Sequence, residues 1–233
     1  MRAVLRTATY LSALLICATA CSQYGEEAEL YEDAELLSSF AAWGIESLQA
    51  PVRDDEARIE LGRLLFFDPV LSGPKNISCG DCHSPVAGTG DDLPMGFGTG
   101  AIGLGEKRRG SVDILTPRNT PHIYNMGHAD VRDMFWDARI AHDYENRAFF
   151  APAPELTAYD DRFPERAYRP DIISTLDGVL AAQALFPLVT PPEMQGFPGQ
   201  SELGDTIGDA GRTWDRIMRR LLGANGIAEY EQL

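Results

Sequence analysis

Hydrophobic residues recur three or four positions apart in four segments of the chain, and almost no segment alternates between apolar and polar residues as a half-buried strand does. Helices are therefore predicted over these segments, and the predicted fold class is all-α. The second segment follows the acidic residues Asp54, Asp55 and Glu56, and the fourth stops at Gly223, a typical helix end. The four apolar stripes are Leu36, Leu37, Phe40, Trp43 and Leu48; Ala57, Leu61, Leu64 and Leu65; Leu176, Val179, Leu180 and Ala184; and Trp214, Ile217, Met218 and Leu221.

Two long stretches rich in glycine and proline separate the predicted helices. They run from Gly88 to Gly110 and from Ala151 to Pro170. Loops of this length in a compact domain usually carry function or are disordered. They fit a fold whose core is filled partly by something other than polypeptide.

The first twenty residues have the pattern of a secretory signal. Arg2 and Arg6 precede an apolar run over about residues 10–16, which is too short to span a bilayer, and small residues then lead to Cys21. Small residues before a cysteine resemble the bacterial lipobox, in which that cysteine is lipidated. The alternative is ordinary cleavage near Ala20. Either way the mature protein is predicted to be exported, and lipidation would hold it on a membrane in the periplasm.

Composition bounds the partners and the domain count. The 233 residues include 35 acidic and 20 basic ones, for a net charge of −15, which makes nucleic acid an unsuitable partner. Six of the ten residues from Glu26 to Glu35 are acidic, as in a solvated tether or a frayed first helix turn. Residues 21–50 are therefore predicted to form an acidic tether and a first helix, and residues 51–233 the main domain.

The four cysteines cannot build a disulfide framework. Cleavage of the signal removes Cys17, and lipidation uses Cys21, which leaves only Cys79 and Cys82. Stabilisation of the mature domain must then come from something other than cross-links.

The remaining pair lies in "ISCGDCHSP", which contains the CxxCH signature of c-type haem attachment. Cys79 and Cys82 lie about one helical turn apart and reach the two vinyl groups, and His83 then points at the iron. A thioredoxin-type redox pair would need a strand–helix context that is absent, and a zinc site would need a second ligand pair. One covalently bound haem c is predicted.

The ligand on the other side of the iron decides between an enzyme and an electron carrier. Spacing does not select one. For each candidate, a core methionine or a surface histidine is the simpler interpretation. The candidates are Met95, Met126, Met134, Met194, Met218, His122, His128 and His142.

Six blocks occur in order between about Ile59 and Met194, and together they closely resemble the bacterial di-haem cytochrome c peroxidase and MauG family. In that family two cytochrome c-like helical domains each carry one haem, and hydrogen peroxide reacts at the amino-terminal haem. This chain resembles the amino-terminal domain. The blocks are "LGRLLFFDP", "LSG", "ISCGDCHSP", "PRNTPHIYN", "MFWDAR" and "QALFPLVTPPEM".

The resemblance implies roles for four further residues. Gln183 and Glu193 match the polar pair over the peroxidatic iron, with Glu193 as acid and base for the two oxygens of peroxide. Trp136 matches a tryptophan on the electron route between the haems, and Asn119 matches a residue that helps to bind calcium. Each has a structural alternative: Trp136 as a core aromatic, Asn119 as a turn residue, Glu193 as a cap or solvated side chain, and Gln183 as a packing residue.

Two departures from the family pattern change the expectation. Many relatives have a histidine that blocks the distal side of the haem, whereas "LPMGFGTG" places Thr99 there, so the resting site is expected to be open. The following Lys107, Arg108 and Arg109 form either a solvated basic loop or the source of a replacement ligand.

The chain contains no second CxxCH motif. Peroxide reduction takes two electrons, so we expect either a truncated chain or a separate polypeptide that carries the second haem, with a donor cytochrome or other redox protein. The rival hypothesis is a mono-haem electron-transfer cytochrome c with a closed sixth coordination site. A haem-bearing sensor or scaffold is a third class that nothing in the sequence favours.

Overall fold

The computed structural model describes residues 33–47, 49, 55–143, 148–157 and 168–223. The chain divides into two compact units, residues 1–50 and 51–233. The first contains a helix over residues 33–42. The predicted stripe extends further than this helix, because the chain turns at Trp43 and at Gly44, whose φ is +63°. Trp43 is 83% exposed, and Leu48 lies outside the described residues.

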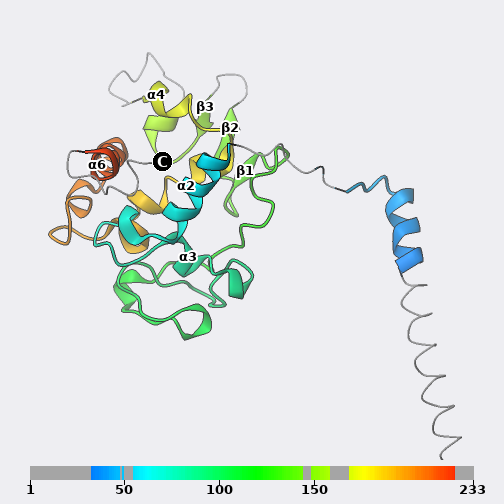
Figure 1. Ribbon diagram of the computed structural model, residues 1–233, viewed down its shortest axis with the longest axis horizontal. Helices are drawn as coiled ribbons and strands as arrows, with labels where there is room; N and C mark the ends of the chain where they lie inside the picture. The colour runs from blue at the N-terminus through cyan, green and yellow to red at the C-terminus, as the bar shows by residue number, and fades with distance from the viewer. Residues whose placement is uncertain (1–32, 48, 50–54, 144–147, 158–167, 224–233) are drawn as a thin grey trace, which may run out of the picture. The chain divides into compact units, whose positions relative to one another are not determined.

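The second unit is built from short helices joined by long connections (Figure 1). Its α-helices are α2 (Glu56–Phe67), α3 (Cys79–Cys82), α4 (Pro170–Ile173), α5 (Val179–Gln183) and α6 (Ala210–Leu222). Single turns of 3₁₀-helix are η1 (Pro69–Leu71), η2 (Pro85–Ala87), η3 (Gly105–Lys107), η4 (Val112–Ile114), η5 (Pro154–Leu156), η6 (Pro187–Val189) and η8 (Gly204–Thr206), and η7 (Pro191–Gln195) is a π-helical turn.

A small antiparallel sheet corrects the all-α prediction. Its strands are β1 (Asp133–Met134), β2 (Ile140–Asp143) and β3 (Ala148–Phe150), in the order β1-β2-β3. Strands of two to four residues are too short to show an alternating pattern, which is why the sequence did not reveal them. The unit is thus helical with one three-stranded sheet among its described residues.

The two longest helices confirm two of the predicted helices, although in the α2 stripe Ala57 is exposed and only the three leucines pack against the core. In α2 the Asp55 side chain accepts a hydrogen bond from the Ala57 amide and caps the helix. In α6 the helix ends at Gly223 as predicted, although Met218 is exposed rather than part of the buried face. Helix α5 is shorter than its stripe, because Gly178 has a φ of +146° that interrupts the helix before Val179.

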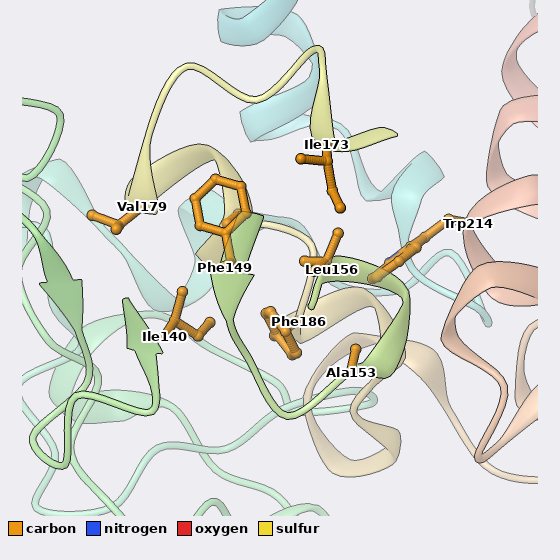
Figure 2. Close-up of a cluster of buried hydrophobic side chains, with 9 residues drawn as sticks. Ile140, Phe149, Ala153, Leu156, Ile173, Val179, Phe186 and Trp214 are labelled. Carbon is orange, nitrogen blue, oxygen red and sulfur yellow. The ribbon is translucent and has the colours of Figure 1, made fainter. Parts of the chain in front are cut away.

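Two apolar clusters form the core of this unit. The sheet cluster gathers side chains from β2, β3, η5, α4, α5, η6 and α6 (Figure 2). The cysteine cluster packs against both thiols of α3 and against Leu61, Leu64 and Leu65 of α2. In Figure 1 the sheet lies toward one end of this unit and α3 toward the other. The buried members of the cysteine cluster are Val70, Ile77, Leu188, Met194, Leu203, Ile217 and Leu221.

None of the helices that the structure describes is both long and apolar enough to cross a bilayer. The predicted signal and Cys21 lie outside the described residues.

Candidate haem and peroxide site

Helix α3 presents the two thiols of the CxxCH motif on a single turn. At its start the Asp81 carboxylate accepts hydrogen bonds from the Ser78 amide at 2.7 Å and the Ser78 hydroxyl at 3.0 Å. This arrangement is a form of the capping box and fixes the turn locally. Cys79 and Cys82 are free thiols, half-buried against the cysteine cluster. The thiols therefore lie one helical turn apart, as attachment to two vinyl groups requires.

His83 is the C-terminal cap of α3 and is held by backbone groups. Its amide donates to the Cys79 carbonyl at 2.8 Å, and its ring Nδ1 lies 3.1 Å from the Thr89 carbonyl. Burial lowers the pKa of His83, and the carbonyls of Thr89 and Pro121 offset part of this effect. The neutral imidazole that results is the form that ligates iron, and a carbonyl on Nδ1 fixes its orientation.

The thiols are in the wrong environment for redox catalysis. Burial raises the pKa of Cys82 to about 11, and although Arg108 acts in the opposite direction, Asp91, Asp81 and Glu193 raise it further. Burial also raises the pKa of Cys79. A thioredoxin-type pair needs a depressed pKa. Among the described residues there is no group of three His, Cys, Asp or Glu side chains that could hold a metal ion.

Residues 97–99 join α3 to a segment more than 100 residues away in the sequence: the Cys82 thiol donates to the Phe97 carbonyl at 3.7 Å, and the Thr99 amide donates to the Pro192 carbonyl. Glu193 lies in the π-helical turn η7 after Pro191 and Pro192. Such turns often occur at functional sites. Its side chain is partly exposed, but burial of the carboxyl group raises the Glu193 pKa, which Arg139 partly offsets. The structure therefore holds a carboxyl group with a raised pKa in a turn that interacts electrostatically with Cys82 of α3.

Comparison of the sequence with known proteins shows the family of the chain. The sequence profile of the family described as di-haem cytochrome c peroxidase matches residues 56–232. The chain belongs to this family. Its relatives include cytochrome-c peroxidase IdrP2 of Pseudomonas sp. strain SCT, 34% identical over 36% of this chain and 19% of the relative. The methylamine utilization protein MauG of Methylorubrum extorquens is 34% identical over 35% of this chain and 19% of the relative.

A longer alignment joins the chain to cytochrome c551 peroxidase of Nitrosomonas europaea, which is 28% identical over 65% of this chain and 48% of the relative. The chain thus spans about a fifth to a half of the length of these curated relatives.

In this di-haem peroxidase family member, two backbone segments fasten the turn that carries Glu193. The Thr99 amide donates to the Pro192 carbonyl at 3.1 Å, and the Gly73 amide donates to the Met194 carbonyl at 2.8 Å. The Thr99 side chain is buried, and its hydroxyl donates to Asn76 Oδ1 at 2.8 Å. Thr99, predicted from the family pattern to replace a blocking histidine, is therefore a support for the turn.

Gly98 makes the close approach between these segments possible. A Cβ atom at this position would lie 1.7 Å from the Pro192 carbonyl oxygen. We expect Gly98→Ala to lower the free energy of unfolding by about 1–3 kcal/mol, because the backbone of η7 must move. Gly62→Ala in α2 is the matched control, since a Cβ there meets nothing within 4 Å and alanine favours helix by about 1 kcal/mol. Urea unfolding measures both, and equal stability of the two variants would contradict the close contact.

Trp136 is 69% exposed, and the Arg118 guanidinium lies 4.0 Å from its ring centroid. The alternative interpretation of Trp136 as a core aromatic is therefore wrong. Asn119 is exposed and donates through Nδ2 to the Leu93 carbonyl at 2.5 Å, so its amide joins two loop segments. Gln183 is the last residue of α5 and is partly exposed.

The candidate sixth ligands separate by burial. Met95 and Met218 are exposed, as is His122, whereas Met194 is only 4% exposed and belongs to the cluster that contacts both haem-attachment thiols. Met134 packs against the sheet cluster. The other candidates, Met126, His128 and His142, are half-buried.

Sequence reasoning missed two buried charged residues beside the motif. Asp91 is fully buried, accepts hydrogen bonds from Thr120 Oγ1 and the Leu93 amide, and raises the pKa of His83. Arg108 is only 2% exposed, which corrects the prediction of a solvated basic loop for that residue, while Lys107 and Arg109 are exposed. Nothing in the run of three basic residues distinguished the middle one, because the loop has no periodicity.

Proposed function

We propose that this chain carries one c-type haem on Cys79, Cys82 and His83 and reduces hydrogen peroxide at that haem. The observation that carries the proposal is that residues 97–99 contact both the CxxCH helix and the turn of Glu193: the Cys82 thiol donates to the Phe97 carbonyl at 3.7 Å, and the Thr99 amide donates to the Pro192 carbonyl at 3.1 Å. Membership of the di-haem cytochrome c peroxidase family supports the same reaction. A haem bound there supplies a ferric iron at which the O–O bond of peroxide is cleaved heterolytically.

The residues around the haem have separate tasks in this proposal. Glu193 in its ionised form takes a proton from one oxygen of peroxide and returns it to the other, so one carboxyl group serves both steps. Burial raises its pKa toward the range in which both forms are accessible. Gln183 orients the bound oxidant. The Thr89 carbonyl fixes the ring of His83 and increases its electron donation.

Complete reduction of hydrogen peroxide to two water molecules consumes two electrons and two protons. We assign the entry of electrons to Trp136, whose indole is exposed to a donor. Arg139, three residues further, opposes the rise in the Glu193 pKa, which supports a route from this segment toward η7. The donor is a reduced cytochrome or other redox protein, or a polypeptide that carries a second haem.

Trp136→Phe is expected to slow reduction of the oxidised protein by such a donor without loss of stability. Substitutions at exposed positions usually change the unfolding free energy by less than about 0.5 kcal/mol. Stopped-flow absorbance with a reduced cytochrome measures the electron transfer, and thermal unfolding measures the stability. Trp43→Phe, at an exposed tryptophan of the other compact unit, is the control. Unchanged electron transfer in the Trp136 variant would remove this residue from the route.

One observation favours a second function, electron transfer by a haem whose sixth coordination position is occupied by a protein ligand. Met194 is buried in the cluster that contacts Cys79 and Cys82, as a thioether ligand would be. If Glu193 chemistry operates at an open site, Met194→Leu should leave the ferric absorption spectrum unchanged, since leucine fills a similar volume. Loss of a methionine-ligation band in this variant would instead establish the electron-transfer alternative.

The proposal also covers the bounds of the haem domain, its cellular location and calcium binding. Residues 51–233 are proposed to be the cytochrome c-like haem domain, exported to the periplasm and anchored through a lipidated Cys21. Calcium is proposed to bind near Asn119, whose Oδ1 can act as an oxygen ligand. Equilibrium dialysis against calcium, with Asn119→Ala as the comparison, tests the last point.

The experiment that tests the central proposal is a spin-state measurement on the purified ferric protein before and after addition of peroxide. An open site predicts a high-spin contribution that peroxide removes. A six-coordinate low-spin spectrum that peroxide does not alter would refute it.

A further inference from the structure

We infer that Arg108 is a positioning residue that couples the haem-attachment helix α3 to the turn that carries Glu193. This inference rests on the proposed role of Glu193, but it assigns a function to a residue from the basic loop that neither the motif nor the family blocks include.

The guanidinium of Arg108 bonds to both sides of this junction. Its Nε donates to the Phe97 carbonyl at 2.8 Å, and one terminal nitrogen donates to the Gly98 carbonyl at 3.4 Å. The other terminal nitrogen donates to the carbonyl of Asp81 at 3.4 Å and lies 4.0 Å from Asp81 Oδ1. It also donates to the Gly103 carbonyl at 3.4 Å. One side chain therefore holds α3 and residues 97–98 together.

Residues 98–99 in turn contact the π-helical turn η7 directly. The Thr99 amide donates to the Pro192 carbonyl, and a Cβ on Gly98 would lie 2.8 Å from the Glu193 Cα atom. No flexible side chain separates Arg108 from the backbone of Glu193. The path runs from Asp81 through the guanidinium and the Gly98 carbonyl to η7.

The burial of Arg108 argues for a specific task. A buried cation costs several kcal/mol unless it is paired and hydrogen-bonded, and the carboxylate of Asp81 is at the outer limit of an ion pair. Only arginine offers donors in a planar fork that can meet carbonyls in several directions. A smaller apolar side chain would fill this place without the desolvation penalty if packing were the only need.

The test is a double-mutant cycle between Arg108 and Glu193 in the full-length holoprotein. Arg108→Gln and Arg108→Lys are each made in the wild-type and the Glu193→Gln background, with Arg109→Gln as the matched control from the exposed neighbour. Two rates are measured by stopped flow, the reaction of the ferric protein with hydrogen peroxide and its binding of hydrogen cyanide, which also loses a proton when it binds ferric iron. Haem per polypeptide is measured in every variant.

We expect Arg108→Gln to slow both reactions by roughly 10-fold to 100-fold in the wild-type background, as displacement of a catalytic group does. In the Glu193→Gln background the same change should slow them less than about twofold, because the residue that Arg108 positions is already lost. Arg108→Lys should resemble Arg108→Gln, since an ammonium group keeps the charge but cannot bond to the several carbonyls. Arg109→Gln should leave both rates unchanged.

Equal slowing in both backgrounds, or a lysine variant that behaves as the wild type, would overturn the inference. If Arg108→Gln fails to fold or to attach haem, the inference is tested by comparing Arg108→Lys in the wild-type background with Arg108→Lys in the Glu193→Gln background. A wild-type protein that is inert to peroxide but shows the coupling with cyanide would refute the proposed peroxidase function and leave the positioning role intact. Absence of any effect of Glu193→Gln on cyanide binding would overturn the positioning role.

Discussion

Replacing Cys79 and Cys82 together with serine is expected to abolish covalent haem attachment. Serine cannot form the thioether bonds, and no other described residue supplies a second thiol near α3. When the double variant is expressed with a haem-maturation system and then denatured, the polypeptide should retain no haem. Its band on a denaturing gel should not stain for haem. Single substitutions should leave one thioether and a haem held on one edge.

The same double variant should also be less stable than the mature protein, because both thiols pack against the cysteine cluster and a bound haem would bury further apolar surface. Cys21→Ser is the matched control, since that cysteine precedes residues 51–233 and is proposed to carry a lipid and not the haem. It should retain the full haem content. Covalently bound haem in the double variant, or its loss in the Cys21 variant, would contradict the assignment of the motif.

Glu193→Gln is expected to slow the reaction of the ferric protein with hydrogen peroxide by about 10²- to 10⁴-fold, the usual contribution of a general acid–base group. Glutamine keeps the size and the hydrogen-bonding groups but cannot exchange a proton. Stopped-flow absorbance gives the second-order rate constant. Glu106→Gln, at an exposed acidic residue of η3, is the control and should react as the wild type does. A rate within twofold of wild type in the Glu193 variant would exclude the proposed role.

The pH dependence of the wild type follows from the same residue. Burial raises the pKa of Glu193 above its ordinary value of 4.5, and among charged side chains Arg139 opposes this shift. The ionised form is the base, so the peroxide rate should rise with pH through this raised pKa, and Glu193→Gln should lack that limb. The folded state also holds this proton more tightly than the unfolded state does. The stability due to protonation is therefore lost as pH rises through the folded-state pKa. Because glutamine does not titrate, the unfolding free energy of Glu193→Gln should increase relative to that of the wild type over this pH range.

The sequence predicted the parts of the site that depend on short-range patterns. The CxxCH spacing predicted that Cys79 and Cys82 lie one helical turn apart with His83 next to them, as α3 has them, and the acidic opening at residues 54–56 and Gly223 marked ends of the two longest helices. The family blocks indicated Glu193 and Gln183 but did not show what positions them in the fold. For Glu193 the positioning contacts are tertiary, because η7 is held by hydrogen bonds from the amides of residues 73 and 99.

What the sequence could not predict lies in irregular segments. The sheet consists of strands of at most four residues, below the length at which periodicity is visible. Arg108 looked like its exposed neighbours, because the burial of a loop side chain depends on which carbonyls surround it. For Trp136 the sequence left open a place on the electron route or a place in the core, and its 69% exposure argues against the core.

The Asp81 carboxylate that closes the start of α3 has a consequence for the maturation of this protein. This carboxylate accepts hydrogen bonds from the amide and the hydroxyl of Ser78. The helical turn that contains both cysteines is therefore fixed by hydrogen bonds within six consecutive residues, 78–83. A porphyrin attached here would react with two thiols whose backbone spacing is already fixed, so little chain entropy would remain to be lost when the second thioether forms.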